Sequence, residues 1–210
     1  KVYVFHGGPD GVTGDSSNPA WSATGEVVGY FFGVSVASAG DVNGDGYADV
    51  AVGSAYFNSR QGKVYVFHGG PGGITGAAIA PAWSTGGEAI DDNFGAAVAG
   101  AGDVNGDGYA DLLVGAYQYN GNTQGKIYVF QGSAGGIIGT AAAPAWSAPG
   151  EGGLGSSVAG IGDVNGDGYA DIAAGSVGYN SGMGKVYVFH GSAGGITGTA
   201  AAPAWSATGE

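Results

Sequence analysis

Short apolar runs separated by Gly-rich and polar segments set the pattern of this chain. One run is apolar at every position after its first lysine and occurs four times. It reads Lys-Val-Tyr-Val-Phe at 1–5, 63–67 and 185–189, and Lys-Ile-Tyr-Val-Phe at 126–130. Val, Ile, Tyr and Phe favour extended strands, and a strand that is apolar on both faces must be covered on both faces. No stretch keeps a helical period. The pattern therefore predicts an all-β chain of short strands in stacked sheets.

These runs belong to a unit that repeats along the chain about every 60 residues, with its first lysine at 1, 63, 126 and 185. After the run come a Gly-rich turn, Pro-Ala-Trp-Ser at 19–22, 81–84, 144–147 and 203–206, and a small-residue segment at 33–40, 95–102 and 155–162. An acidic loop follows, and then another apolar strand at 49–54, 111–116 and 171–176. Four strands in a unit of this length predict a blade of a β-propeller, because independent domains would need a larger core.

The repeat divides the chain into blades of four antiparallel strands. We expect a half blade of two strands at 1–26 and three full blades at 27–87, 88–149 and 150–210. The chain begins and ends with the same two-strand half unit, so unpaired edges are expected at both ends, and such edges favour association. We expect a homodimer or a higher oligomer that completes a ring, although simple addition of these units does not close one.

An identical nonapeptide, Asp-Val-Asn-Gly-Asp-Gly-Tyr-Ala-Asp, occurs at 41–49, 103–111 and 163–171. Side-chain oxygens stand at its positions 1, 3, 5 and 9, a glycine suited to a sharp turn stands at 6, and position 7 offers a backbone carbonyl. Ca²⁺ takes six to eight oxygen ligands, so this spacing predicts three calcium sites. The expected ligands are Asp41, Asn43, Asp45, Tyr47 and Asp49 in the first loop, Asp103, Asn105, Asp107, Tyr109 and Asp111 in the second, and Asp163, Asn165, Asp167, Tyr169 and Asp171 in the third.

The acidic loops have two other interpretations, an EF-hand and an ion-free turn. The loops are not EF-hands, because Val52, Val114 and Ala174 occupy position 12, where an EF-hand has glutamate. An ion-free turn remains an alternative, since Asp, Asn and Gly favour turns by themselves. However, nine of the 17 acidic residues of the chain lie in these loops, and their mutual repulsion favours a bound cation.

The charge of the chain excludes several kinds of partner. With 17 acidic against five basic residues the net charge is −12, which argues against nucleic acid and anionic membrane surfaces. No apolar run is long enough to insert into a membrane. The chain has no cysteine, and no Ser-His-Asp or Cys-His arrangement can be assembled, so we expect no enzymatic activity.

Residues on either side of the acidic loops resemble the FG-GAP repeat of the integrin α-subunit β-propeller and its bacterial relatives. Phe32-Gly33 and Phe94-Gly95 match the FG element, and Leu154-Gly155 departs from it in the third unit. The GAP element is degenerate, as Gly53-Ser54-Ala55, Gly115-Ala116-Tyr117 and Gly175-Ser176-Val177. The resemblance implies an extracellular or cell-surface binding protein with calcium loops at the blade rim, of which this chain is about half a seven-bladed ring.

Other repeated residues have a structural and a functional interpretation. His6, His68 and His190 would lie around a circle, too far apart for a zinc site, so a structural role at strand ends is expected. Trp21, Trp83, Trp146 and Trp205 predict packing between blades, with sugar stacking as the alternative. Tyr56, Tyr117, Tyr119 and Tyr179, beside Asn58, Asn120 and Asn180, form a second candidate sugar surface in variable loops.

The sequence thus predicts a calcium-binding, non-catalytic scaffold for binding or assembly, which completes a ring by self-association and binds a protein or glycan ligand. A multivalent carbohydrate-binding lectin is the first alternative, because repeated weak sites give avidity. An engineered half-propeller with no ligand beyond calcium is the second.

Overall fold

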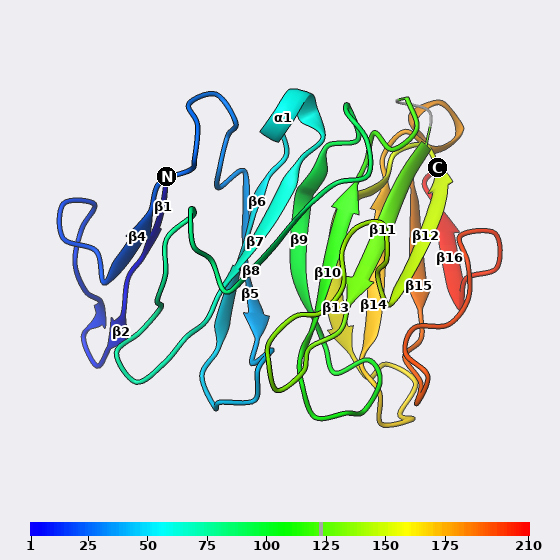
Figure 1. Cartoon of the computed structure of the whole chain (residues 1–210). Helices are drawn as coiled ribbons and strands as arrows, with labels where there is room; N and C mark the ends of the chain where they lie inside the picture. Colours follow the sequence, from blue (N-terminus) through cyan, green and yellow to red (C-terminus); the bar gives the residue numbers. More distant parts are fainter. Residues whose placement is uncertain (122–123) are drawn as a thin grey trace.

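The computed structural model describes residues 1–121 and 124–210, and its strands form antiparallel sheets that follow one another in chain order (Figure 1). The first four-stranded sheet contains β5 (Ser35–Gly40), β6 (Asp49–Ser54), β7 (Lys63–Phe67) and β8 (Trp83–Gly86). The second contains β9 (Phe94–Gly102), β10 (Asp111–Ala116), β11 (Gln124–Phe130) and β12 (Trp146–Glu151). The third contains β13 (Leu154–Gly162), β14 (Asp171–Ser176), β15 (Lys185–Phe189) and β16 (Trp205–Thr208).

Smaller elements complete the described structure. A two-stranded sheet pairs β1 (Val2–Val4) with β4 (Trp21–Ala23), and β2 (Gly7–Gly8) pairs with β3 (Gly11–Val12). Two tight turns, α1 (Phe57–Arg60) and η1 (Tyr179–Gly182), lie in the connections before β7 and β15, and each contains residues at positive φ. No helix in the described part of the chain has the length and apolar character needed to cross a membrane. The expectation of an all-β propeller architecture is confirmed.

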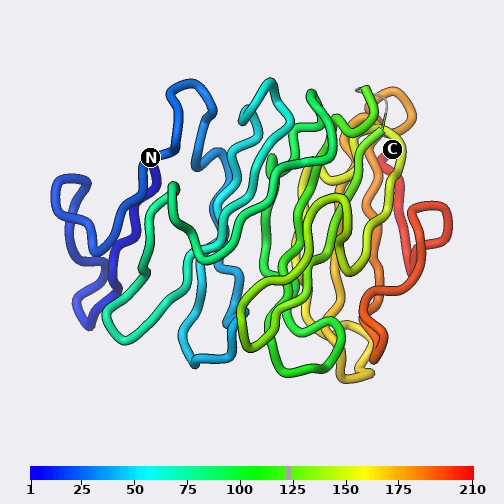
Figure 2. Tube along the Cα trace, in the orientation of Figure 1, coloured from blue at the N-terminus to red at the C-terminus, as the bar shows by residue number. Residues whose placement is uncertain are grey.

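Each sheet packs face to face on the next, and three apolar clusters fill the spaces between them. The cluster between the first two sheets includes Val64, Val66, Phe94, Val114 and Phe130, which are buried. In the first two four-stranded sheets the apolar run of the third strand, β7 or β11, supplies residues to the clusters on both sides of its sheet, as its composition predicts. Figure 2 shows the sheets side by side from the N-terminus to the C-terminus, with the termini at opposite ends of the row.

Glycines let neighbouring sheets approach closely at the FG element. A Cβ atom on Gly53 of β6 would lie 1.9 Å from the carbonyl oxygen of Gly95, and one on Gly115 of β10 would lie 2.1 Å from that of Gly155. Gly95 and Gly155 also adopt φ values of +80° and +90°, which disfavour any side chain. The glycine of one FG element therefore packs against the strand after the acidic loop of the preceding sheet, and neither position admits a larger residue.

Aromatic residues pack beside these glycines. The ring of Phe94 is fully buried and meets Tyr128 edge to face, with ring centroids 5.1 Å apart. Trp83 of one sheet packs on Phe130 of the next at 5.2 Å, and its indole nitrogen donates to the carbonyl oxygen of Gly139 at 3.2 Å. Trp21 and Trp146 make the corresponding ring contacts with Phe67 and Phe189. The packing interpretation of these tryptophans is confirmed.

The third sheet has one uncovered face in the described structure. Val186 of β15 is 45% exposed, whereas its counterparts Val64 and Ile127 are fully buried. Trp205 is 55% exposed, because no following sheet of the described residues supplies a phenylalanine against it.

Candidate metal-binding loops and junctions between sheets

The three acidic loops connect the first two strands of each sheet, and they lie together along the lower edge in Figure 1. Position 9 of each loop is also the first residue of the following strand, β6, β10 or β14. The hairpin setting therefore places the same oxygen-bearing residues at the same end of every sheet.

Hydrogen bonds to backbone amides shape each loop. Asp41 Oδ1 accepts from the amides of Gly44 at 2.7 Å and Asp45 at 3.1 Å, and its Oδ2 accepts from Gly46 at 2.8 Å. Asn43 Oδ1 accepts from the same Asp45 amide at 3.0 Å. Because one amide serves both side chains, the oxygens at positions 1 and 3 are held on the same side of the loop.

The side chain at position 5 is linked to this group. Asp45 Oδ1 accepts from the amide of Tyr47 at 2.9 Å, while its Oδ2 accepts from Asn43 Nδ2 at 3.0 Å. The second and third loops repeat every one of these hydrogen bonds. In the third loop, the amides, with Gly168 contributing most, lower the pKa of Asp163 below its usual range.

The aspartate at position 9 has a different environment, because it is completely buried in all three loops. Asp49 Oδ2 accepts from the amide of Val42 at 2.8 Å, and its Oδ1 accepts from the amide of Gly69 at 2.8 Å. Asp111 bonds Val104 and Gly132 in the same way, and Asp171 bonds Val164 and Gly191. This residue therefore closes the loop and ties it to the end of the third strand, a role that spacing alone did not predict.

Burial and neighbouring charges act together on this carboxylate. Burial raises the pKa of Asp111 to about 6, against the effect of its two amide donors, and the carboxylates of Asp107 and Asp103 raise it further. Burial likewise raises the pKa of Asp49. The carboxylates at positions 1, 5 and 9 of the second loop are thus near enough to influence one another.

The donor set suits calcium in kind, since each loop offers three carboxylates, an amide oxygen and backbone carbonyls. Within the described residues, however, no three His, Cys, Asp or Glu side chains are gathered closely enough to hold a metal ion. The loop oxygens accept hydrogen bonds from loop amides instead. The tyrosine at position 7 is expected to offer its carbonyl to the ion, and its ring also packs against the neighbouring acidic loop. The ring of Tyr109 lies on Gly44 of the first loop, where an added Cβ would be only 2.7 Å from it.

Two of the three repeated histidines, His6 and His68, contact the sheet that follows their own. A Cβ on Gly73 would lie 3.0 Å from His6 Nε2, and one on Gly136 would lie 2.7 Å from His68 Nε2. His6 and His68 thus each pack on a glycine in the Gly-rich turn of the next sheet, which agrees with a structural role at strand ends.

The variable-loop tyrosines and asparagines also have structural contacts. The Tyr119 and Tyr179 rings lie 4.7 and 4.9 Å from the ammonium groups of Lys126 and Lys185. Tyr117 accepts a hydrogen bond from Asn93, and Tyr56 packs on Phe31. Asn58, Asn120 and Asn180 all adopt positive φ, which asparagine tolerates well. Residues 122–123 of the second variable loop lie outside the described residues.

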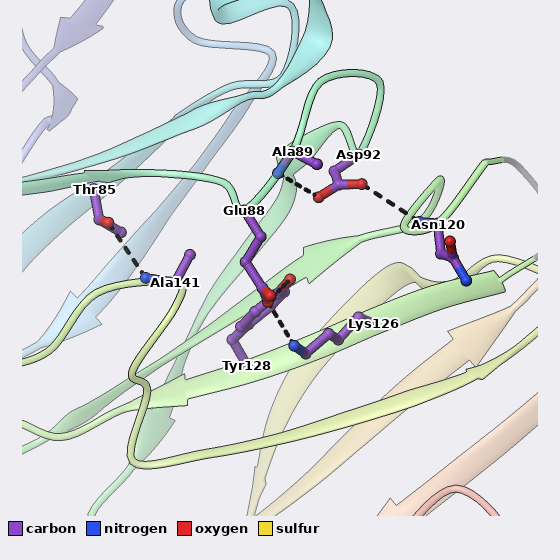
Figure 3. A network of polar contacts seen from close by, with 8 residues as sticks. All are labelled: Thr85, Glu88, Ala89, Asp92, Asn120, Lys126, Tyr128 and Ala141. Carbon is purple, nitrogen blue, oxygen red and sulfur yellow. Dashed lines mark hydrogen bonds and ion pairs between the residues drawn. The ribbon is translucent and has the colours of Figure 1, made fainter.

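A glutamate at the end of one sheet binds two residues of the next, a contact that sequence reasoning missed. Glu88 Oε1 lies 2.5 Å from Lys126 Nζ and accepts from the Tyr128 hydroxyl at 2.9 Å (Figure 3). Glu26 makes the same contacts with Lys63 at 2.6 Å and Tyr65 at 3.1 Å. Burial, reinforced by the glutamates, raises the pKa of Tyr65 and Tyr128. The available signal was a glutamate five residues after the tryptophan in every unit.

Further polar contacts support the junction that Figure 3 shows. The buried carboxylate of Asp92 accepts from the amides of Ala89 at 2.9 Å and Asn120 at 3.4 Å, which links the connection before β9 to the loop before β11. Burial raises the pKa of Asp92, against the effect of these two donors. Thr85 Oγ1 accepts from the amide of Ala141 across the same junction.

Comparison with known proteins supports the assignment made from these features. The FG-GAP repeat model matches residues 32–67, 94–130 and 154–189, each stretch running from the FG position to the end of the third strand. The chain belongs to the FG-GAP repeat family. The structure explains the FG-GAP signature as a packing device, because its glycines make the close contacts between sheets.

Integrin α-subunits are among the similar proteins. Integrin alpha-3 of Mus musculus is 42% identical over 106 residues, which is 49% of this chain and 10% of the mouse protein. Integrin alpha-7 of Homo sapiens is 36% identical over 166 residues, 75% of this chain and 13% of the human protein. Integrin alpha-6 of Gallus gallus is 38% identical over 160 residues, 72% of this chain and 14% of that protein. The chain thus spans only a small part of these relatives.

Proposed function

We propose that the chain is a calcium-stabilised, non-catalytic propeller scaffold for binding and assembly. The observation that carries this proposal is the repetition of one loop geometry in three hairpins, with the oxygens of positions 1, 3 and 5 linked through shared amides. In each loop the ion would be held by the side chains at positions 1, 3, 5 and 9 and by the carbonyl at position 7. Its positive charge would offset three carboxylates that otherwise repel one another.

The expected stabilisation follows from mass action. Extracellular calcium modules bind with dissociation constants of about 10⁻⁴–10⁻³ M. Calcium at tenfold excess over such a constant adds about 1.4 kcal/mol per site. Isothermal titration calorimetry should therefore give three ions per chain, and the thermal midpoint should rise with calcium and fall in chelator.

Variants within and outside the loops make this test specific. Asp45→Ala, Asp107→Ala and Asp167→Ala should each remove one ion from the stoichiometry, while Asp91→Ala, which changes an exposed acid outside the loops, should remove none. A wild-type chain that takes up no calcium at millimolar concentration, with a midpoint indifferent to chelator, would contradict the proposal.

Self-association is the second part of the proposal. We expect the chain to divide into a half blade at 1–26 and full blades at 27–87, 88–149 and 150–210. This division leaves a sheet of only two strands at one end of the row and a sheet with one uncovered face at the other. The exposed side chains of Val186 and Trp205 on that face support a docking role. We expect a homodimer or higher oligomer by light scattering after size exclusion, and Trp205→Asp should shift the mass toward the monomer. A monomeric wild type at high micromolar concentration would contradict this part.

The biological setting comes from the relatives alone. Their integrin α names support placing this scaffold outside the cell or at its surface, with a protein or glycan ligand and no catalytic step. Secretion of a tagged parent protein, followed by surface labelling, tests the location.

A further inference from the structure

The three junctions between sheets differ in the length of one connection. Five residues separate Glu26 from Phe32 and Glu88 from Phe94, whereas only Gly152 and Gly153 separate Glu151 from Leu154. In the first two junctions the longer connection lets the glutamate turn inward, toward the lysine and tyrosine of the next sheet.

The short connection leaves the third glutamate, Glu151, at the rim of its junction, where among the described residues it makes neither the ion pair nor the tyrosine hydrogen bond of Glu26 and Glu88. Strand β12 runs on to Glu151, which pairs with Gln124 and is exposed. Its backbone carbonyl accepts from Ser176 Oγ at 2.6 Å, and Gly152 and Gly153 turn the chain directly into β13 with φ values of +65° and +76°. Within the described residues Lys185 forms no ion pair, although Lys63 and Lys126 each bind a glutamate.

A cavity of about 380 Å³ lies at this third junction. Its lining includes Gln124, Glu151, Tyr179, Lys185 and Tyr187. The Lys185 ammonium is held by the rings of Tyr179 and Tyr187, with distances of 4.9 and 4.6 Å to the ring centroids, so its position is defined without a carboxylate. Tyr187 is 2% exposed, and its hydroxyl donates to no described residue.

We propose that this cavity binds the carboxylate of an acidic side chain from a partner protein, in the place that Glu26 and Glu88 occupy at the other two junctions. Lys185 supplies the charge, the Tyr187 hydroxyl supplies a hydrogen-bond donor, and the Gln124 amide lies in the wall. An acidic side chain is favoured over other carboxylates because a glutamate side chain, with its aliphatic stem, fills both equivalent positions, one of which, that of Glu88, is shown in Figure 3. None of the acidic-loop residues lines the site, so binding there does not depend on calcium binding in the loops.

Titration by ¹H–¹⁵N NMR with a matched pair of probes tests the site. N-acetylglutamate amide carries the carboxylate, and N-acetylglutamine amide is its neutral isostere. The acidic probe should give saturable shifts at residues 179–187, and the neutral probe should not. Lys185→Met should weaken binding about tenfold or more, because it removes a charged hydrogen-bond partner. Lys63→Met, at a junction filled by Glu26, should leave binding unchanged.

Two further variants distinguish the proposal from its rivals. Glu151→Gln should strengthen binding severalfold, because it removes a like charge from the rim. Replacing Gly152-Gly153 by the sequence of residues 89–93, which restores the longer connection, should abolish binding while the thermal midpoint is kept. Equal response to both probes, unchanged binding by Lys185→Met, or binding by Glu151→Gln alone would overturn the proposal. Tighter binding of methyl glucuronide would also overturn it, since the site would then belong to an acidic sugar.

Discussion

Asp111→Ala removes a carboxylate that is fully buried and that accepts two backbone hydrogen bonds. One donor is the amide of Val104, in the same loop, at 2.8 Å. The other is the amide of Gly132, beyond the end of β11, at 2.9 Å. The substitution therefore leaves two donors without an acceptor at the point where loop, second strand and third strand meet.

The magnitude follows from those two donors. A buried group that loses its partner costs about 1–3 kcal/mol, so two cost about 2–6 kcal/mol. The same burial that raises the pKa of Asp111 to about 6 makes its charge unfavourable, and removing that charge returns part of the loss. We therefore expect the free energy of unfolding to decrease by about 2–4 kcal/mol, the lower part of the range for two lost partners.

Chemical denaturation followed by tryptophan fluorescence measures this decrease, and chelator must be present so that no ion contributes. Asp107→Ala is the matched control, because Asp107 is exposed in the same loop and bonds only loop atoms. It should change stability by about 1 kcal/mol or less. Equal effects of the two variants in chelator would refute the structural role, and Asp111 would then matter only through a bound ion.

Three other predictions follow from the packing and the junctions. Gly115→Ala should destabilise the fold by about 2–3 kcal/mol or more in thermal unfolding, because its Cβ would meet the Gly155 carbonyl. Gly175→Ala should cost less, because its Cβ meets mainly the movable Ser157 hydroxyl, and equal losses would contradict the FG packing. Absorbance titration should show that Tyr65 and Tyr128 ionise at higher pH than ordinary tyrosines, and ordinary ionisation of all tyrosines would contradict this. The free energy of unfolding should decrease above about pH 10, because the unfolded chain then releases protons that the folded chain retains. At a protein concentration low enough for light scattering to give the monomer mass, acrylamide quenching should lose its most accessible component in Trp205→Phe and keep it in Trp83→Phe. Loss of that component in Trp83→Phe instead would contradict the uncovered face.

The strands could be predicted well wherever the local pattern decides them. The segments expected at 49–54, 111–116 and 171–176 coincide with β6, β10 and β14. The last residue of an acidic loop marks the start of each strand, and a glycine stands near its end. The role of Gly53 and Gly95 was not accessible in the same way. Their contact joins residues 42 positions apart in different sheets, and only the stacking of the sheets brings them together.

The acidic loops could be predicted as a unit, but not the separate role of their last residue. Spacing treats Asp49 like Asp41, since both carry carboxylates in one turn. The structure separates them, because position 9 is the buried first residue of a strand, whereas position 1 is partly or fully exposed. Burial is a property of the sheet behind the loop, and the nonapeptide by itself contains no information about it.

The lower edge and the junction glutamates show two uses of the same repeat. Along the lower edge the second and third loops each bond the loop before them, since the Ala110 amide donates to the Asp41 carbonyl and the Ala170 amide to that of Asp103, both at 3.0 Å. A change in any loop would disturb its neighbour as well, which gives a physical reason for three identical copies. The junctions are less constrained, because the side chains of Glu26 and Glu88 each bond only to the following sheet. Three fewer residues after Glu151 are enough to convert a closed ion pair into an open cavity, so this part of the repeat can vary without loss of the sheets themselves.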